Sequence, residues 1–407
     1  MPLSWFDRVL FSGVQRAAGP APVRLAMGTP DYSLTTMPSE VPTVWIKDRA
    51  ALRALARNPQ INFGDLYSEG AIEVEGNLVD LIERLYKVPV SFSARIYSKW
   101  LSWLESNSPR GSRDNIHHHY DISNDFYKLW LDPQMVYTCA YFPEPEASLE
   151  EAQRAKMDHV CRKVWLRPGE TVVEAGCGWG ALALHMAGQY GVKVKAFNIS
   201  SEQIAYARER AKRVGLASRV EFIQDDYRNI SGRFDAFVSV GMLEHVGKKH
   251  YTEMAGVIGR TIGDWGRGLL HFIGRSRSQS MNPWIRRRIF PGAYPPALRE
   301  VMEFLEPHQF SVLDVENLRQ HYARTCECWL KAFEQQFEIV KAQLGSRFAR
   351  MWRLYLAGST AAFRVGSLQL FQVVFAGREC ASQPWNRSYL YQPRGEGEEQ
   401  ECARAMS

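Results

Sequence analysis

The chain has 407 residues with a formal net charge of +6; 45% of the residues are hydrophobic, 12% aromatic and 23% charged. This composition is typical of a globular protein and excludes a disordered chain, a collagen-like repeat and a coiled coil. No run of about 18 apolar residues is present, so we expect no transmembrane helix. The seven cysteines are scattered and odd in number, which favours a reducing, cytoplasmic location over a disulfide framework.

The N-terminal region combines helical and strand-like patterns. Residues 4–14 are amphipathic, and residues 40–90 mix short apolar runs with helical periodicity,. Residues 105–118 are polar and contain Ser, Pro and Gly, which marks a domain boundary,. We therefore predict a small α+β domain over residues 1–105, a catalytic domain over 106–386 and a mobile polar tail over 387–407.

The larger domain begins with a largely helical pattern over residues 119–167. From residue 171 the chain repeats a strand, a glycine turn and a helix, which predicts an α/β fold with a Rossmann-like parallel sheet,. A proline-rich insertion covers residues 275–300, helices are expected near 315–360, and residues 368–376 form a buried final strand.

Basic residues are concentrated in one segment. Eight arginines lie between residues 260 and 299, where Asp264 is the only acid. Two interpretations of this segment are open: a solvated basic face, or a surface that attracts anionic lipid headgroups. Trp284 and the amphipathic segment at the start of the chain favour the lipid interpretation. RNA-binding and zinc-finger signatures are absent, so no nucleic-acid partner is expected. The internal run of histidines at 117–119 lacks further ligands, and we predict no metal site,.

The strongest local motif is an apolar strand that ends in Glu174 and is followed by Gly176, Gly178 and Gly180. Glycines at such a turn let the backbone approach a ligand closely. The spacing differs from that of dinucleotide binders, and a carboxylate before the turn suits a cationic ligand. S-adenosylmethionine, which carries a sulfonium and an ammonium, fits this pattern; a tight turn without a ligand is the alternative.

Further candidate cofactor residues follow the next two strands. Asn198, Ile199 and Gln203 stand where many nucleotide binders hold the ribose, and an amide can hydrogen-bond a hydroxyl,. Asp226 and Tyr227 stand where the adenine would lie. An ordinary acidic turn is the alternative interpretation of the latter pair.

Several separate blocks carry a family pattern: residues 118–142, 174–180, 238–247, 269–274 and 368–377, with a further likeness at 63–76. Together they resemble cyclopropane-fatty-acyl-phospholipid synthases of the mycolic acid cyclopropane synthase family. The resemblance implies a class I methyltransferase that transfers a methylene group from S-adenosylmethionine to the cis double bond of unsaturated phospholipid acyl chains. It also implies a homodimer at the inner face of the membrane, and a lid over the cofactor that includes Tyr137 and Thr138.

The chemistry implied by the resemblance needs a dry site and a base. An alkene that attacks the sulfonium methyl becomes a carbocation, which water would capture and aromatic faces would stabilise. The resemblance further implies a bound bicarbonate that removes a proton before the ring closes. It assigns this anion to Cys139, Glu244, His271, the backbone of Ile273, and Tyr322, whose donors and carboxylate suit it.

Other functions remain open. A relative that makes methyl-branched or exomethylene fatty acids would, by the resemblance, carry an acid at the position of Gly241. A relative that methylates amines is disfavoured by the arginine-rich segment and the N-terminal domain. A non-catalytic lipid-binding protein is disfavoured by the intact Glu174, Glu244 and His271. Ser359 stands where some members carry a cysteine, which argues against a thiol nucleophile.

Overall fold

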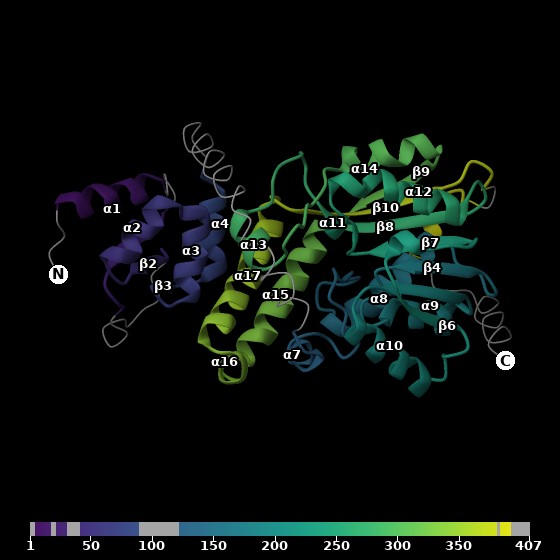
Figure 1. The fold of residues 1–407 in the computed structure, drawn as a ribbon, viewed down its shortest axis with the longest axis horizontal. Helices are drawn as coiled ribbons and strands as arrows, with labels where there is room; N and C mark the ends of the chain where they lie inside the picture. Colours follow the sequence, from purple (N-terminus) through teal and green to yellow (C-terminus); the bar gives the residue numbers. More distant parts are fainter. Residues whose placement is uncertain (1–4, 18–21, 31–40, 89–121, 381–382, 392–407) are drawn as a thin grey trace. The chain divides into compact units, whose positions relative to one another are not determined.

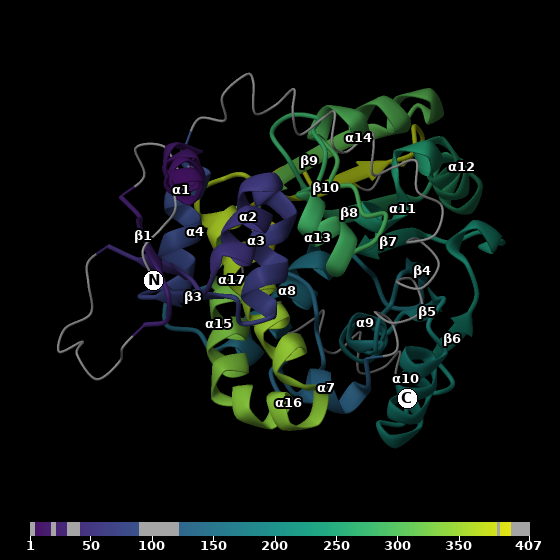
Figure 2. The ribbon, with the colours of Figure 1, turned by 60° about the vertical axis from the view of Figure 1, so that its left-hand side comes forward.

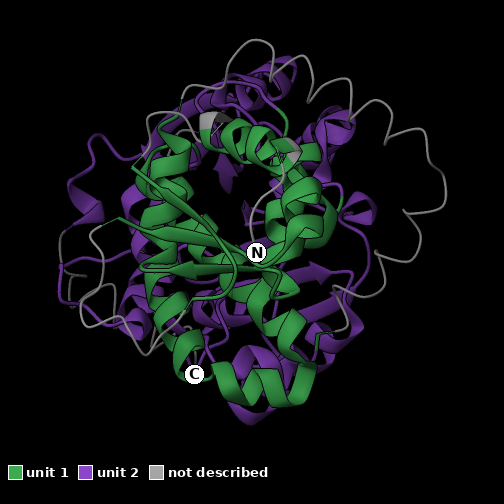
Figure 3. Cartoon of the chain, turned by 90° about the vertical axis from the view of Figure 1, so that its left-hand side faces the viewer, with its two compact units in different colours: residues 1–122, 280–291, 326–367 green, residues 123–279, 292–325, 368–407 purple. Residues whose placement is uncertain are grey.

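The computed structural model describes residues 5–17, 22–30, 41–88, 122–380 and 383–391, and Figures 1 and 2 draw their ribbon from two directions (Figure 1, Figure 2). These residues fall into two compact units (Figure 3). Unit 1 comprises residues 1–122, 280–291 and 326–367, and unit 2 comprises residues 123–279, 292–325 and 368–407. The predicted boundary at residue 105 lies outside the described residues.

Unit 1 contains a three-stranded sheet in the order β1 (Arg24–Met27), β2 (Thr43–Ile46), β3 (Ile72–Glu75). The first pair of strands is parallel and the second antiparallel. Its helices are α1 (Trp5–Ala17), α2 (Arg49–Arg57), α3 (Pro59–Ser68), α4 (Leu78–Tyr86), α13 (Pro283–Arg288), α16 (Phe337–Leu344) and α17 (Ser346–Arg364). The helix expected at residues 4–14 and the mixture of helices and strands within 40–90 are confirmed.

The proline-rich insertion is anchored to α3. Trp284 is buried, and a Cβ atom on Gly64 would lie 2.4 Å from its indole ring. The indole Nε1 donates to Asp65 Oδ1 over 3.1 Å, and the Arg288 guanidinium donates to both oxygens of Asp65. Trp284 and Arg288 therefore do not belong to an exposed lipid-facing surface, because a carboxylate and a glycine of unit 1 already take up their side chains.

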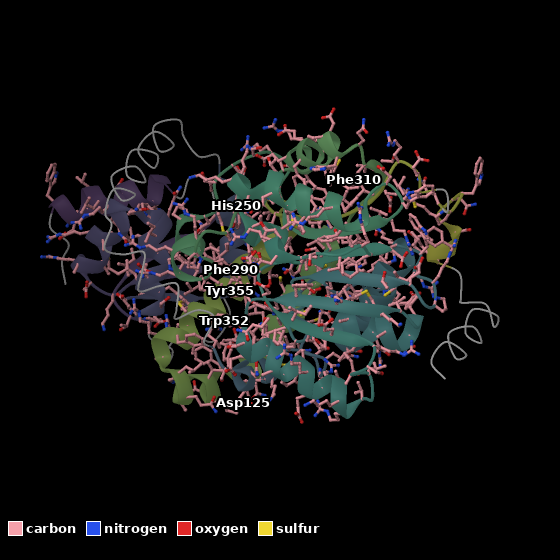
Figure 4. All side chains as sticks on the ribbon, turned by 45° about the vertical axis from the view of Figure 1, so that its right-hand side comes forward. Asp125, His250, Phe290, Phe310, Trp352 and Tyr355 are labelled. Carbon is pink, nitrogen blue, oxygen red and sulfur yellow. The ribbon has the colours of Figure 1, made fainter. Side chains whose placement is uncertain are left out.

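Aromatic and cationic contacts also join α17 to the rest of unit 1. The ring of Phe290 packs edge-on against Tyr355, and Tyr355 against Trp352, with centroids 5.4 and 5.2 Å apart (Figure 4). The guanidinium of Arg350 lies 4.4 Å from the ring centroid of Tyr67 and donates to its carbonyl oxygen. Such contacts place residues 280–291 and 326–367 in unit 1, whereas the sequence division assigns them to the catalytic domain.

Unit 2 contains a seven-stranded sheet in the order β6-β5-β4-β7-β8-β10-β9. The strands are β4 (Thr171–Ala175), β5 (Lys193–Asn198), β6 (Val220–Gln224), β7 (Ala236–Val240), β8 (Arg267–Gly274), β9 (Ser311–Asn317) and β10 (Gln369–Ala376). The strands from β6 to β8 are parallel, and β10 runs antiparallel to both of its neighbours. The predicted α/β architecture and the buried final strand are confirmed.

Helices cover both faces of this sheet (Figure 1). One apolar core joins the sheet to α8 (Leu149–Lys163), α9 (Ala181–Tyr190) and α10 (Ser201–Arg213). A second core joins it to α12 (Tyr251–Ile262) and α14 (Leu298–Leu305). The start of α8 is fixed by a capping box between Ser148 and Glu151, which satisfies two backbone donors of its first turn.

Two sequence expectations for unit 2 are wrong. Strand β9 was not predicted and runs into the segment near 315–360 where helices were expected, because an exposed edge strand carries polar residues and lacks a continuous apolar run,. Residues 119–167 are not largely helical: only α7 (Asn124–Lys128) and α8 are helices among the described part of this segment. Between these helices Met135 adopts a φ of 59°, and Pro143 and Pro145 interrupt helical hydrogen bonding,.

The arginine-rich segment and the tail also differ from expectation. Arg267 and Arg275 are 4% and 7% exposed, so neither contributes to a solvated face. The Arg267 guanidinium instead donates to the Val164 carbonyl and to Glu170, which compensates for the loss of water. In the predicted tail, Leu390 is buried, while residues 392–407 lie outside the described part of the chain. No described helix is long and apolar enough to span a membrane.

Candidate active site

The loop between β4 and α9 has a backbone that only glycine adopts readily. Gly176, Gly178 and Gly180 have φ values of +86°, +52° and +81°, in the left-handed region that disfavours a Cβ atom. A Cβ on Gly176 would lie 2.9 Å from Met242, and one on Gly180 would lie 2.5 Å from the Phe222 ring. No atom lies within 4 Å of a Cβ built on Gly178, so the loop is packed at both ends and open in its middle.

Glu174 is a buried carboxyl group at the end of β4. It is 2% exposed, and its Oε2 atom has no hydrogen-bond partner among the residues that the structure describes. Burial raises its pKa to about 8, and the nearby ammonium of Lys156 opposes that shift. A buried carboxyl with one unpartnered oxygen, beside a glycine loop, suits a ligand that brings its own positive charge,.

Polar and apolar side chains lie next to each other at the end of β5 and directly after it. The Asn198 amide donates to Gln203 Oε1 over 2.7 Å and to the Gly178 carbonyl over 3.3 Å, so it ties this edge to the glycine loop. Ile199 is 66% exposed, which offers an apolar surface at the edge of the sheet. The structure therefore brings these predicted cofactor residues together with the loop.

Asp226 and Tyr227 stand at the carboxyl end of β6, where η1 (Tyr227–Asn229) begins. Asp226 accepts from the Arg228 backbone over 2.9 Å and from its guanidinium over 2.8 Å. Arg228 lowers the pKa of this carboxyl, and burial raises the pKa of Tyr227 to about 12. The Asp226 carboxylate therefore caps a short helix, and its contact with a cofactor remains a prediction.

The segment that contains Tyr137 and Thr138 is held by two residues of α8. The Gln153 amide donates to the Thr138 carbonyl over 2.9 Å, and Lys156 Nζ donates to Thr138 Oγ1 over 2.8 Å. Lys156 is 1% exposed, and burial lowers its pKa to about 8. The Tyr137 ring lies 5.3 Å from the Trp130 ring, so an aromatic wall continues from this segment.

Three of the residues predicted to hold the anion, Glu244, His271 and Ile273, lie in β8 or shortly after β7. Glu244 lies in α11 (Leu243–Val246), and its Oε1 accepts from the Ile273 backbone amide over 3.3 Å. Burial raises the pKa of Glu244 to about 7 and lowers that of His271 well below its usual range. Within the described residues, Glu244 Oε2 and His271 Nε2 are buried and have no hydrogen-bond partner.

Cys139 and Tyr322, from distant parts of the chain, come together at one backbone carbonyl. The Cys139 thiol and the Tyr322 backbone amide both approach the Leu318 carbonyl, at 3.9 and 3.1 Å, at the start of α15 (Arg319–Gln335). Burial raises the pKa of the Cys139 thiol, which keeps it protonated and unreactive. The role of the Tyr322 hydroxyl remains a prediction.

Gly241 links the two parts of the site. It has a φ of +74°, and its backbone amide donates to the His271 carbonyl over 2.8 Å. A Cβ atom at this position would lie 2.7 Å from Thr138 Cγ2. The cofactor-side segment therefore packs directly against the turn that leads to Glu244.

Sequence reasoning missed three buried polar residues of this region: Gln153, Lys156 and Gln372. Gln153 and Lys156 are three residues apart on the buried face of α8, which also carries His159 and Lys163, and Gln372 interrupts the apolar strand β10. A polar residue in an apolar run is the signal that could have identified them.

Comparison with known proteins decides the family. The family model described as mycolic acid cyclopropane synthetase matches residues 107–373. The chain belongs to this family. A second model, for a domain of unknown function, matches residues 31–96.

Relatives of this family member agree with the assignment. A probable fatty acid methyltransferase of Pseudomonas putida is 34% identical over 87% of this chain and 92% of the relative. The cyclopropane-fatty-acyl-phospholipid synthase of Escherichia coli K12 is 40% identical over 63% of this chain and 66% of the relative.

The solved mycolic acid cyclopropane synthase CmaA1, complexed with SAH and CTAB, is 29% identical with a TM-score of 0.61; the likeness covers 64% of this chain and 97% of that one. Unit 2 is thus a class I methyltransferase fold, and the protein is an S-adenosylmethionine-dependent methyltransferase. The co-substrate fits the glycine loop and the unpartnered carboxyl of Glu174.

Proposed function

We propose that this methyltransferase adds a methylene group from S-adenosylmethionine across the cis double bond of unsaturated phospholipid acyl chains. The observation that carries the proposal is the pair of buried, unpartnered atoms, Glu244 Oε2 and His271 Nε2, beside the cofactor loop. A methyl transfer to an amine or a hydroxyl needs a base for one acidic proton. A cyclopropane requires removal of a proton from carbon, which calls for a dedicated, desolvated acceptor.

In the proposed reaction, each bond that forms is matched by one that breaks. The alkene π electrons form a carbon–carbon bond to the sulfonium methyl, and the methyl–sulfur bond breaks to release the neutral thioether. The substrate is then a carbocation, which must lose one proton from the transferred methyl before the second carbon–carbon bond closes the ring. Aromatic faces such as that of Tyr137 can stabilise a desolvated cation by about 2 kcal/mol.

The predicted bicarbonate fits the residues present. Glu244 Oε2 can accept from its hydroxyl, and His271 Nε2 and the Tyr322 hydroxyl can donate to it, with Cys139 lining the site; the Ile273 backbone amide donates to Glu244 Oε1 and would be shared with the anion,. When bound, this anion would supply a weakly nucleophilic base. The chain itself holds the site dry, because Glu244, His271 and Cys139 are all at most 4% exposed.

A second candidate is a methyl-branching or exomethylene-forming fatty acyl methyltransferase. The name of the Pseudomonas putida relative, which matches most of both chains, favours it. Gly241 argues against this candidate, because by the family resemblance such an enzyme would carry an acid at this position. In this chain an acidic side chain there would collide with Thr138 and would place a non-glycine residue at a positive φ,.

The test is incubation of the purified protein with S-adenosylmethionine and monounsaturated phospholipid vesicles, followed by gas chromatography and proton NMR of the acyl chains. A cyclopropane adds one carbon and removes the vinyl protons, which would support the proposal. A product that gains one carbon but keeps alkene protons would support the exomethylene alternative. No product would support a non-catalytic lipid-binding protein.

We also propose that the protein docks on anionic membranes at the inner face of the cytoplasmic membrane. Supporting residues are exposed: Trp5 on α1 is 79% exposed, and Arg277, Arg286 and Arg287 are exposed. Charge attraction of this kind is screened by salt. Flotation with anionic vesicles should therefore weaken as salt rises, and salt-independent flotation would indicate apolar docking. We further propose that the protein forms a homodimer, and the molecular mass measured by sedimentation tests this.

A further inference from the structure

Gln372 lies in β10, between strand β8, which carries His271, and the edge strand β9. In β10 it pairs directly opposite His271 of β8 on one side and Glu316 of β9 on the other. Residues directly opposite in antiparallel strands point to the same face of the sheet. Gln372 is fully buried, so its amide must be explained by a contact rather than by solvent.

The contact that Gln372 makes is with the imidazole of His271. Gln372 Nε2 lies 3.0 Å from His271 Nδ1 in a buried environment. An amide nitrogen is a donor only, so Nδ1 accepts and carries a lone pair. The other ring nitrogen, Nε2, lies free of protein partners among the described residues and is left to face the site.

The surroundings of His271 favour a neutral ring. Lys156, His159 and Lys163 of α8 face it and Glu316 of β9 is the acidic neighbour. Glu316 is already engaged by His159 at 2.8 Å and by Lys163 at 2.7 Å. Burial and the two lysines together hold the pKa of His271 well below its usual range. A neutral imidazole carries one proton, so a lone pair on Nδ1 puts that proton on Nε2.

We propose that Gln372 is a positioning residue that fixes His271 as the Nε2–H tautomer, so that His271 donates a hydrogen bond to the carboxylate-like anion of the site. This inference rests on the proposed function for the identity of the anion, bicarbonate. A ring that donates through Nε2 cannot also take up a proton there. Glu244 is then the side chain that accepts the hydroxyl proton of the anion, and His271 is the side chain that donates to it.

The tautomer can be measured without any turnover. The protein is labelled with ¹⁵N-histidine, and the ring resonances of His271 are assigned as those missing from a His271→Asn variant. We expect a protonated Nε2 and an unprotonated Nδ1 at pH 7. A protonated Nδ1 with a bare Nε2, or a doubly protonated ring, would overturn the inference whatever reaction the enzyme performs.

A substitution separates positioning from folding. Gln372→Met keeps the size of the side chain but removes the donor, and Gln369→Met makes the same change at the start of β10, where the amide contacts Asn317 instead. In Gln372→Met we expect a mixed tautomer spectrum and a half-saturating bicarbonate concentration raised about tenfold, with S-adenosylmethionine affinity within twofold. Gln369→Met should match the wild type in all three.

The outcomes distinguish the two proposals. An unchanged His271 spectrum in a folded Gln372→Met variant would refute the role of Gln372. A second outcome is the expected tautomer combined with turnover that does not depend on bicarbonate. Gln372 would then still determine the tautomer, but donation from His271 to bicarbonate, and with it the proposed anion, would be contradicted. If Gln372→Met does not fold, the wild-type spectrum alone still decides the tautomer.

Discussion

The proposed cofactor edge, at the ends of β4 and β5, depends chiefly on backbone conformation, whereas the proposed reaction centre at β7, β8 and β10 consists of buried side chains. At the first edge, three glycines with positive φ values shape a loop within a few consecutive residues. At the second, Glu244, His271 and Gln372 come from segments far apart in the sequence and lie at most 4% exposed. Changes at the first edge should therefore affect stability and cofactor binding together, and changes at the second should affect turnover while leaving cofactor binding nearly unchanged.

The largest effect is expected from Glu244→Gln, which keeps the shape of the side chain and removes its proton acceptor. Turnover should fall by about 10²–10⁴-fold, while the affinity for S-adenosylmethionine stays within twofold. Gas chromatography of the product and titration calorimetry check the two parts. Glu253→Gln, at a largely exposed position, is the control, and near-full turnover of Glu244→Gln would remove this residue from the chemistry.

The same variant should be more stable than the wild type at alkaline pH. Burial raises the folded-state pKa of Glu244 from 4.5 to about 7, so the folded protein holds the proton more tightly than the unfolded chain. The wild type therefore loses stability as pH rises from about 4.5 through 7, and the loss is complete above 7. At pH 8 we expect the free energy of unfolding of Glu244→Gln to exceed that of the wild type by on the order of 2–3 kcal/mol. Melting curves at several pH values should show this difference shrinking towards pH 5. A gain that grows at low pH would contradict the assignment.

Two glycines at the cofactor edge sharpen the contrast. Both Gly178→Ala and Gly180→Ala force a positive φ on alanine, but only the second also drives a Cβ into Phe222. Gly180→Ala should lower the free energy of unfolding by about 1–3 kcal/mol more than Gly178→Ala. Denaturant titration measures the difference, and equal losses would show that the Phe222 ring moves aside freely.

The smallest effect is expected at Asn198. Asn198→Ala removes the hydrogen bonds to Gln203 and the Gly178 carbonyl, and should weaken S-adenosylmethionine binding by about 1 kcal/mol. Asn317→Ala, at the end of β9, is the matched control. Calorimetry that finds the two variants alike would place Asn198 outside the cofactor site.

The contrast between the edges also sets what could be predicted. The glycine loop, the alternation of strands and helices, and the final strand follow from local periodicity and were predicted correctly. Strand β9 was missed because an exposed edge strand lacks the apolar run of a buried one. The burial of Arg267 and Trp284 was missed because their partners, Glu170 and Asp65, are distant in the sequence.

The sequence by itself determined the class of fold and the cofactor loop, because both depend on residues a few positions apart and on conformations that glycine alone adopts readily. Only the tertiary structure decided that Gln372 faces His271, that Lys156 holds Thr138, and that Glu244 meets the Ile273 amide. These contacts join strands and helices that the chain reaches after long crossovers, and hydrogen bonds between them are specified by strand order and register, which local patterns do not encode.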